Sequence, residues 1–124
     1  TDDAFAQLYV QLRKKEGRIY SDEEVRQLPT IPSVHPQYRE WLIRKRSCRQ
    51  LLRYIRKKNT SPDILEIGCG NGWLTAQMAE VTSGKVSGLD INHIEIEQAR
   101  RIFGKISNCD FIEGNITAGS PDEQ

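Results

Sequence analysis

The sequence predicts an α/β fold in which N-terminal helices precede the first βαβαβ half of an open, parallel sheet. A short apolar run over 64–67 is followed by alternating glycines and then by apolar residues at helical spacing over 73–81. Two more strand-like runs, 85–89 and 110–113, flank a helical pattern over 92–103. Strands that alternate with helices build a parallel sheet with right-handed crossovers.

The glycine segment is the part of the chain that points to a ligand. Gly68, Gly70 and Gly72 lie between the strand over 64–67 and a helix. Glycine permits a tight turn and lets a ligand approach the backbone, and a helix start offers unpaired N–H groups. The dinucleotide fingerprint G-x-G-x-x-G has its third glycine one residue later, where this chain has Trp73. A plain turn without a ligand is the alternative at this point.

The second strand ends at a carboxylate. Asp90 follows Gly68 at about the interval expected between a glycine turn and the acidic residue that ends the next strand. A carboxylate in this place can accept hydrogen bonds from both ribose hydroxyls of an adenosine ligand. Asp90 therefore indicates an adenosine cofactor, without deciding which one.

An acidic residue followed by the pattern x-G-x-G-x-G fits this stretch at every position, with Glu66, Gly68, Gly70 and Gly72. On these residues, and over roughly residues 60–117, the chain resembles the class I S-adenosylmethionine-dependent methyltransferases. The resemblance implies a Rossmann-like sheet, S-adenosylmethionine as cofactor, and methyl transfer to an acceptor that the sequence leaves unknown. The protein would mainly supply proximity and orientation, and no catalytic base can be named.

The resemblance also implies which residues hold the cofactor. The loop amides would hold the methionine part, Asp90 the ribose, Ile91 one face of the adenine, and Asn115 with Ile116 its edge. Asn115 stands where the family commonly has aspartate, so an amide oxygen would accept the bond there. The complete candidate set is Glu66, Gly68, Cys69, Gly70, Gly72, Asp90, Ile91, Asn115 and Ile116.

Residues 1–58 are expected to form an N-terminal helical segment, and residues 59–124 the first half of the cofactor-binding domain. Helices are expected over 4–15, 21–28 and 37–58, each from its apolar spacing or its capping signature. In the family such helices often cover the cofactor. The candidates for that role are Tyr9, Tyr20 and Trp41.

Charge is divided unevenly along the chain, although the net charge is +1. Residues 1–62 carry fourteen Lys and Arg against seven acidic residues, and residues 63–124 carry four against ten. The basic helix over 37–58 could bind nucleic acid, so a non-catalytic interaction module is one alternative function. An NAD-type oxidoreductase is another, against which the glycine spacing counts. We favour a helix that docks on the core with its charges in solvent.

Several site classes are not expected. Cys48, Cys69 and Cys109 are scattered and form no C-x-x-C, which argues against a disulfide framework or zinc site and for a reducing, cytoplasmic setting. Only two histidines are present, so a histidine metal cluster is not expected either. No apolar run approaches the roughly 18 residues of a membrane span.

The family's sheet has seven strands, whereas this chain shows three strand patterns and then a polar tail. We therefore expect the chain to be the N-terminal portion of a longer methyltransferase. Its first strand, which is central in the family, would then have an open apolar edge. Such an edge is a template for pairing with another chain, so self-association is expected.

Overall fold

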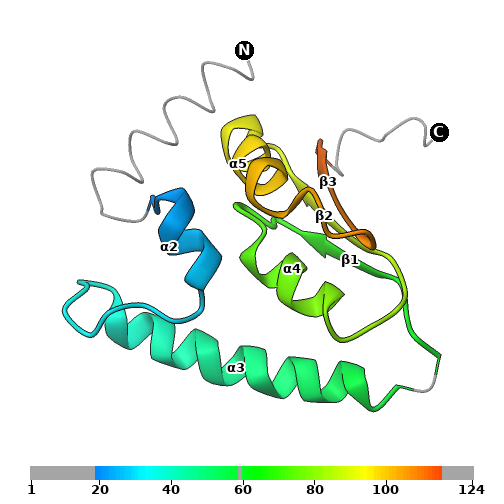
Figure 1. Cartoon of the computed structure of the whole chain (residues 1–124), viewed down its shortest axis with the longest axis horizontal. Coiled ribbons are helices and arrows are strands. Elements are labelled where there is room, and N and C mark those ends of the chain that lie inside the picture. Colours follow the sequence, from blue (N-terminus) through cyan, green and yellow to red (C-terminus); the bar gives the residue numbers. More distant parts are fainter. Residues whose placement is uncertain (1–18, 59, 116–124) are drawn as a thin grey trace.

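The computed structural model describes residues 19–58 and 60–115. The expected helix over 4–15 and the candidate residues Tyr9 and Ile116 lie outside these residues. The elements are α2 (Asp22–Gln27), α3 (Tyr38–Arg56), β1 (Ile64–Ile67), α4 (Trp73–Ala79), β2 (Val86–Asp90), α5 (His93–Phe103) and β3 (Cys109–Glu113) (Figure 1). Helices followed by alternating strands and helices confirm the predicted fold class. The boundaries differ from the predicted ones by one or two residues at several ends.

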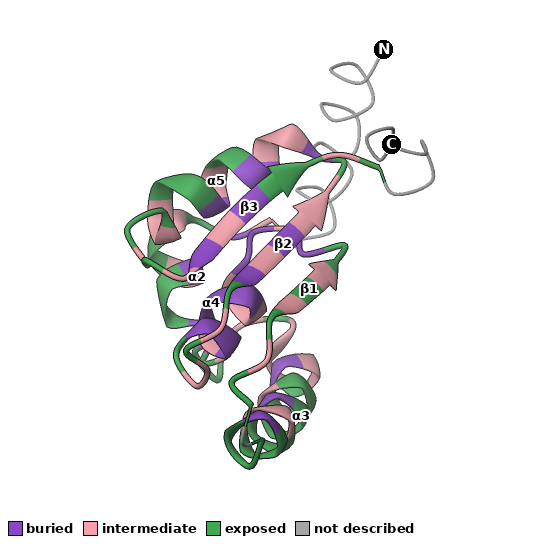
Figure 2. Ribbon diagram, turned by 90° about the vertical axis from the view of Figure 1, so that its right-hand side faces the viewer, coloured by how far each residue is buried: buried purple, intermediate pink, exposed green. Residues whose placement is uncertain are grey.

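The sheet has the order β1-β2-β3 and is parallel throughout. Val86 in the middle strand pairs with Ile64 of β1 and with Cys109 of β3, so the three strands begin level with one another. Both α4 and α5 lie behind the sheet in Figure 2, and no described helix lies in front of it. Parallel strands joined by right-handed crossovers place consecutive helices on the same face in this way.

The main core lies between the sheet and its two helices. Val86 on β2 and Ile96 and Ala99 on α5 are fully buried, and Phe111 on β3 is 5% exposed. These residues belong to one hydrophobic cluster, and the alternation of burial along β2 and β3 follows the two-residue period of a strand. The face of the sheet that α4 and α5 cover is therefore the core face.

The N-terminal helices join the domain through a second apolar cluster. It consists of Tyr20, Val25, Leu28, Ile31 and Trp41, with Trp73 of α4 packed against it. The predicted capping box of α2 is present: Ser21 and Glu24 exchange side-chain to backbone hydrogen bonds at 3.1 and 2.8 Å.

An ion pair also ties α2 to the sheet-covering helix α5. The guanidinium of Arg101 donates to both carboxylate oxygens of Asp22, at 2.7 and 2.9 Å. These hydrogen bonds, with a further one from Gln98, hold the pKa of Asp22 well below its ordinary value.

Helix α3 docks on the core as predicted. Trp41, Cys48 and Ile55 recur every seven residues and are all buried, so they form the inward stripe of the helix. Eight basic residues of this helix and the two positions after it are exposed: Arg39, Arg44, Arg46, Arg49, Arg53, Arg56, Lys57 and Lys58. A nucleic-acid partner for this surface stays the alternative that was not favoured, and nothing in the structure tests it.

Strand β1 lies at an edge of the described sheet, as expected. Leu65 and Ile67 are 53% and 58% exposed, although both are large apolar residues in a strand. They point to the face that no described helix covers. The open edge is thus present, and self-association through it stays a prediction.

Candidate cofactor site

The candidate site lies where the first two strands end. β1 ends beside Gly68 and β2 ends at Asp90, and the carboxyl ends of neighbouring parallel strands lie at the same edge of a sheet. Gly68, Gly70 and Gly72 have φ values of 77°, 55° and 82°, in the left-handed region. A side chain is disfavoured there, which explains why glycine occupies all three positions.

The N–H groups of this glycine loop bond within the protein. Those of Gly68 and Cys69 both donate to the Leu89 carbonyl, at 2.7 and 3.1 Å, and extend the β1–β2 ladder past the strand. That of Gly72 donates to the Cys69 carbonyl at 3.0 Å and closes the turn, and that of Gly70 donates to a carboxylate. These four N–H groups therefore have partners within the protein. That the loop amides and the helix start hold the methionine part of the cofactor stays a prediction.

The three glycines do different work. A Cβ added at Gly68 would meet nothing within 4 Å, so this glycine faces open space. At Gly70 it would lie 3.1 Å from Oε1 of Glu95, whereas at Gly72 it would lie 2.4 Å from the ring of Phe111. Gly72 is buried against β3, so its position is fixed by packing rather than by a ligand.

Asp90 organises the loop as well as facing the site. Its Oδ2 accepts from the N–H of Gly70 and its Oδ1 from the N–H of Asn92, both at 2.8 Å. Each carboxylate oxygen has a further lone pair, so both can still accept a hydrogen bond from a ligand hydroxyl. Asp90 is therefore fixed in direction before any ligand arrives.

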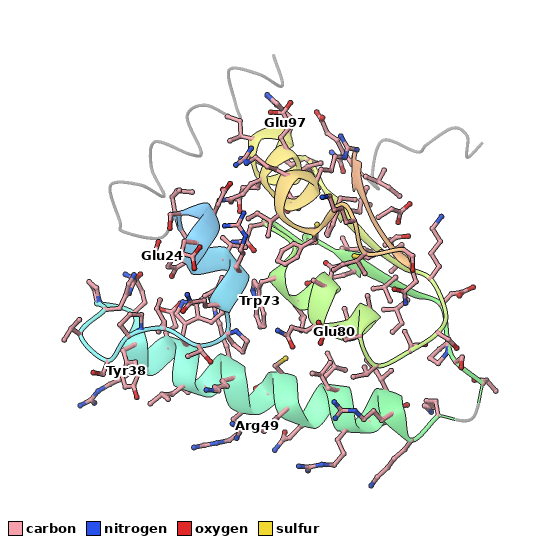
Figure 3. The ribbon with its side chains drawn as sticks, viewed as in Figure 1. Glu24, Tyr38, Arg49, Trp73, Glu80 and Glu97 are labelled. Carbon is pink, nitrogen blue, oxygen red and sulfur yellow. The ribbon has the colours of Figure 1, made fainter. Side chains whose placement is uncertain are left out.

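Among the described residues, two pockets adjoin the loop. The first, called the Asp90 pocket, has a volume of about 160 Å³ and is lined by Tyr20, Trp41, Arg44, Gly68, Cys69, Gly70, Asn71, Trp73, Asp90 and Glu95. The second, called the Glu66 pocket, has about 340 Å³ and is lined by Ile43, Arg44, Ser47, Cys48, Leu51, Glu66, Gly68, Cys69, Trp73 and Leu74. Trp73 is the first residue of α4, on the side of that helix that faces α2 in Figure 3, and it borders both pockets.

A sequence profile of the methyltransferase domain matches residues 57–123, which is more than half of the chain. The chain belongs to the methyltransferase domain family. That match covers the glycine loop, Asp90 and all three strands.

Solved structures agree with this fold. Magnesium protoporphyrin IX methyltransferase from Synechocystis PCC 6803, with bound SAM, aligns at a TM-score of 0.63 and 14% identity, over 97% of this chain and 57% of that one. The plantazolicin methyltransferase BpumL aligns at 0.51 and 21% identity, over 96% of this chain and 41% of that one. This methyltransferase domain thus spans about half the length of the structures that it matches.

Four residues of the Asp90 pocket were not among the predicted site residues: Arg44, Asn71, Trp73 and Glu95. Glu95 follows the acidic strand end by five residues and lies in the first turn of α5, where it is 7% exposed. Its distance in sequence from Gly70 gave no signal of their contact. Tyr20 and Trp41 also line this pocket, and both belong to the buried second cluster. Their role as a cover for the cofactor stays a prediction.

The two pockets do not include the described residues that were predicted to hold the adenine. Ile91 is 42% exposed and Asn115 is exposed at the end of β3, and neither lines the Asp90 or the Glu66 pocket. The N–H of Gly114 donates to the Asp90 carbonyl at 2.9 Å, which holds the end of β3 beside that of β2. The roles of Ile91 and Asn115 stay predictions.

Cys69 has a structural role in this methyltransferase domain, because its N–H bonds to Leu89 and its side chain packs in the core. Its side chain is 6% exposed, and burial raises the pKa of its thiol to about 12. A thiol with that pKa is almost entirely protonated at neutral pH, so Cys69 is poorly suited to act as a nucleophile. Gly88 on β2 makes room for it, because a Cβ there would lie 2.7 Å from the Cys69 sulfur.

Two features are absent from the described residues, 19–58 and 60–115. These residues contain no helix that is both long and apolar enough to cross a membrane. They also contain no group of three or more His, Cys, Asp or Glu side chains that could hold a metal ion.

Glu66 lines the Glu66 pocket and is half-buried. The hydroxyl of Thr75 donates to its Oε1 at 2.6 Å, and burial nevertheless raises the pKa of the carboxyl. A raised pKa means that the folded state binds protons more readily than the unfolded state. Ionised Glu66 therefore lowers the stability of the fold once the pH rises through that pKa.

Glu66→Gln is expected to stabilise the protein at pH 8, because the amide removes a buried charge and its oxygen still accepts from Thr75. The gain should vanish as the pH falls below 4.5, the ordinary value for this carboxyl. Urea unfolding of both proteins from pH 4 to pH 8 measures it. Parallel stability curves over that range would contradict the burial effect.

Proposed function

We propose that this chain is the cofactor-binding part of an S-adenosylmethionine-dependent methyltransferase, with the cofactor in the Asp90 pocket. One observation carries the proposal: the fixed Asp90 carboxylate and the open face of Gly68 line the same pocket at adjacent strand ends. The family match supports it, because it covers this corner of the chain. The methyl acceptor is not assigned.

The groups in the Asp90 pocket fit this cofactor. S-adenosylmethionine carries a ribose diol, an ammonium group, a carboxylate and a positively charged sulfonium. Asp90 and Glu95 supply carboxylates for hydroxyl and cationic groups, and Gly68 leaves space for the cofactor to approach the backbone. The Glu66 pocket is larger but mostly apolar, so it suits these polar groups less well. The adenine would extend past Asp90 toward Ile91 and Asn115.

The bound cofactor supplies a methyl group already activated on a sulfonium. The chain's residues then bind and orient. Asp90 accepts hydrogen bonds from the two ribose hydroxyls, and its bonds to Gly70 and Asn92 prevent it from turning away. The rings of Trp41 and Trp73 pack edge to face, with their centroids 5.1 Å apart. They form an apolar wall that keeps water from one side of the pocket. Holding the two reactants in position is the main contribution expected of the protein.

Calorimetric titration of the full-length protein with S-adenosylhomocysteine tests the proposal, with NAD as the second ligand. Saturable one-to-one binding of S-adenosylhomocysteine and none of NAD is the expected result. Binding of NAD alone would establish the oxidoreductase alternative instead. Binding of neither ligand by protein that unfolds cooperatively on heating would overturn any adenosine-cofactor function and would leave the basic surface of α3 as the feature to pursue.

A further inference from the structure

We propose that Arg44 binds the carboxylate of the cofactor's amino-acid part, which makes an N-terminal helix a direct participant in cofactor binding. This inference rests on the proposed function. Arg44 lies on α3, outside the residues that the methyltransferase domain profile matches. Nothing in the glycine motif or in the acidic strand end points to it.

The charges around the Asp90 pocket single out Arg44. Asp90 and Glu95 supply two carboxylates, and Arg44 is the only Lys or Arg among the described residues that line the pocket. The cofactor brings one negative group, its carboxylate, and positive groups at the ammonium and the sulfonium. Charge complementarity therefore pairs the single cation of the pocket with the single anion of the ligand.

The arginine is held in place before the ligand binds. Its guanidinium lies 4.7 Å from the ring centroid of Trp41 and donates to Oε2 of Glu40 at 3.1 Å. Trp41 is 2% exposed, and its Nε1 donates to the Tyr20 hydroxyl at 2.8 Å. The guanidinium of Arg44 therefore packs on a buried, hydrogen-bonded ring. The Arg44 side chain consequently loses little conformational freedom when a ligand binds.

Arg44 keeps donors for a second partner. A guanidinium has five N–H groups, and the contact with Glu40 uses the Nη2 end. The side chain is 45% exposed, so the remaining donors can reach a ligand. A planar guanidinium can bind a carboxylate through two parallel hydrogen bonds, which suits an amino-acid carboxylate.

The geometry of the pocket gives the ligand its direction. Asp90 comes from the end of β2 and Arg44 from α3, and the glycine loop with Gly68 lies along the same pocket. With its ribose on Asp90, the cofactor would run past Gly68 and present its amino-acid end to α3. Arg44 also borders the Glu66 pocket, so the carboxylate would lie near the boundary between the two pockets.

The competing explanation is structural: Arg44 would only stabilise α3 through Trp41 and Glu40. A cycle of two proteins and two ligands separates the explanations. The ligands are S-adenosylhomocysteine and its decarboxylated analogue, which keeps the adenosine, the sulfur and the amine. The proteins are the full-length wild type and Arg44→Met, which keeps apolar contact with the Trp41 ring.

Calorimetry should show that Arg44→Met weakens S-adenosylhomocysteine binding about 10- to 100-fold, the usual loss for hydrogen bonds between charged groups. Binding of the decarboxylated analogue should change less than about twofold, because it lacks the group that Arg44 contacts. Arg44→Lys should recover part of the lost affinity for S-adenosylhomocysteine. Lysine restores the positive charge but not the paired N–H donors of the guanidinium.

Arg49→Met is the matched control, because Arg49 lies on the same helix and points away from the pockets (Figure 3). It should leave the binding of both ligands unchanged. Equal weakening of both ligands by Arg44→Met, or no weakening of either, would overturn the proposal. A wild type that binds neither ligand would instead mean that the proposed function has failed, so the two failures are distinguishable.

Discussion

Asp90→Ala is expected to weaken S-adenosylhomocysteine binding by at least about 100-fold. Two hydrogen bonds from the ribose hydroxyls to a charged acceptor would be lost, each worth about 1.5–3 kcal/mol. The substitution also removes the acceptor for the N–H groups of Gly70 and Asn92, so the loop loses its anchor. Calorimetric titration of the variant beside the wild type measures the loss.

Further variants separate the two causes of weaker binding in Asp90→Ala, which are a disordered loop and the loss of direct contacts with the ribose. Asp90→Asn keeps an acceptor oxygen for only one of the two backbone N–H groups, and its amide nitrogen would face the other donor. Its binding should be intermediate, and its melting temperature should fall below that of the wild type. Glu97→Gln removes a carboxylate from the exposed surface of α5 and should bind normally. An Asp90→Ala protein that binds as tightly as the wild type would place the ribose elsewhere.

Gly72→Ala is expected to cause the largest loss of stability of any single methyl addition in the loop. Its φ of 82° costs a residue with a side chain about 1–2 kcal/mol. The new Cβ would also lie 2.4 Å from the Phe111 ring and 3.0 Å from the Cβ of Ala99, and overpacking of this kind costs about 1–3 kcal/mol more. The free energy of unfolding should therefore fall by about 2–5 kcal/mol.

Gly68→Ala is the matched control for backbone strain. Its φ of 77° is nearly the same, but the added Cβ meets nothing within 4 Å. Denaturant unfolding should show a loss of only about 1–2 kcal/mol for this variant. S-adenosylhomocysteine binding should nevertheless weaken, because the methyl enters the space proposed for the ligand. Equal losses of stability for the two variants would show that strain alone, and not the contact with Phe111, requires glycine at 72.

Local patterns predicted most of the elements. Ser21 with Glu24 predicted the start of α2, Asn92 caps α5 where the sequence placed a helix start, and the apolar run over 64–67 became β1. These signals succeed because caps, strand periodicity and glycine turns depend on residues within a few positions of one another. The boundary errors of one or two residues arise because helix and strand ends are decided by individual hydrogen bonds.

The site was predicted in part for the same reason. Gly68 and Asp90 could be named because each ends its own strand, and parallel strands bring such ends together. The use of the loop amides could not be foreseen, because Leu89 and Asp90 accept from them across 20 or more positions of sequence. Likewise, the contact of Gly72 with Phe111 joins α4 to β3.

The sequence by itself determined that this protein is an α/β domain with a glycine corner and a carboxylate at the next strand end. Tertiary structure alone decided which glycine faces open space, which one packs on a ring, and which N-terminal residues line the pocket. Arg44, held by Trp41 and Glu40, illustrates the difference. Its place beside the Asp90 pocket depends on how α3 packs on the domain, and that packing follows from contacts between residues far apart in the chain.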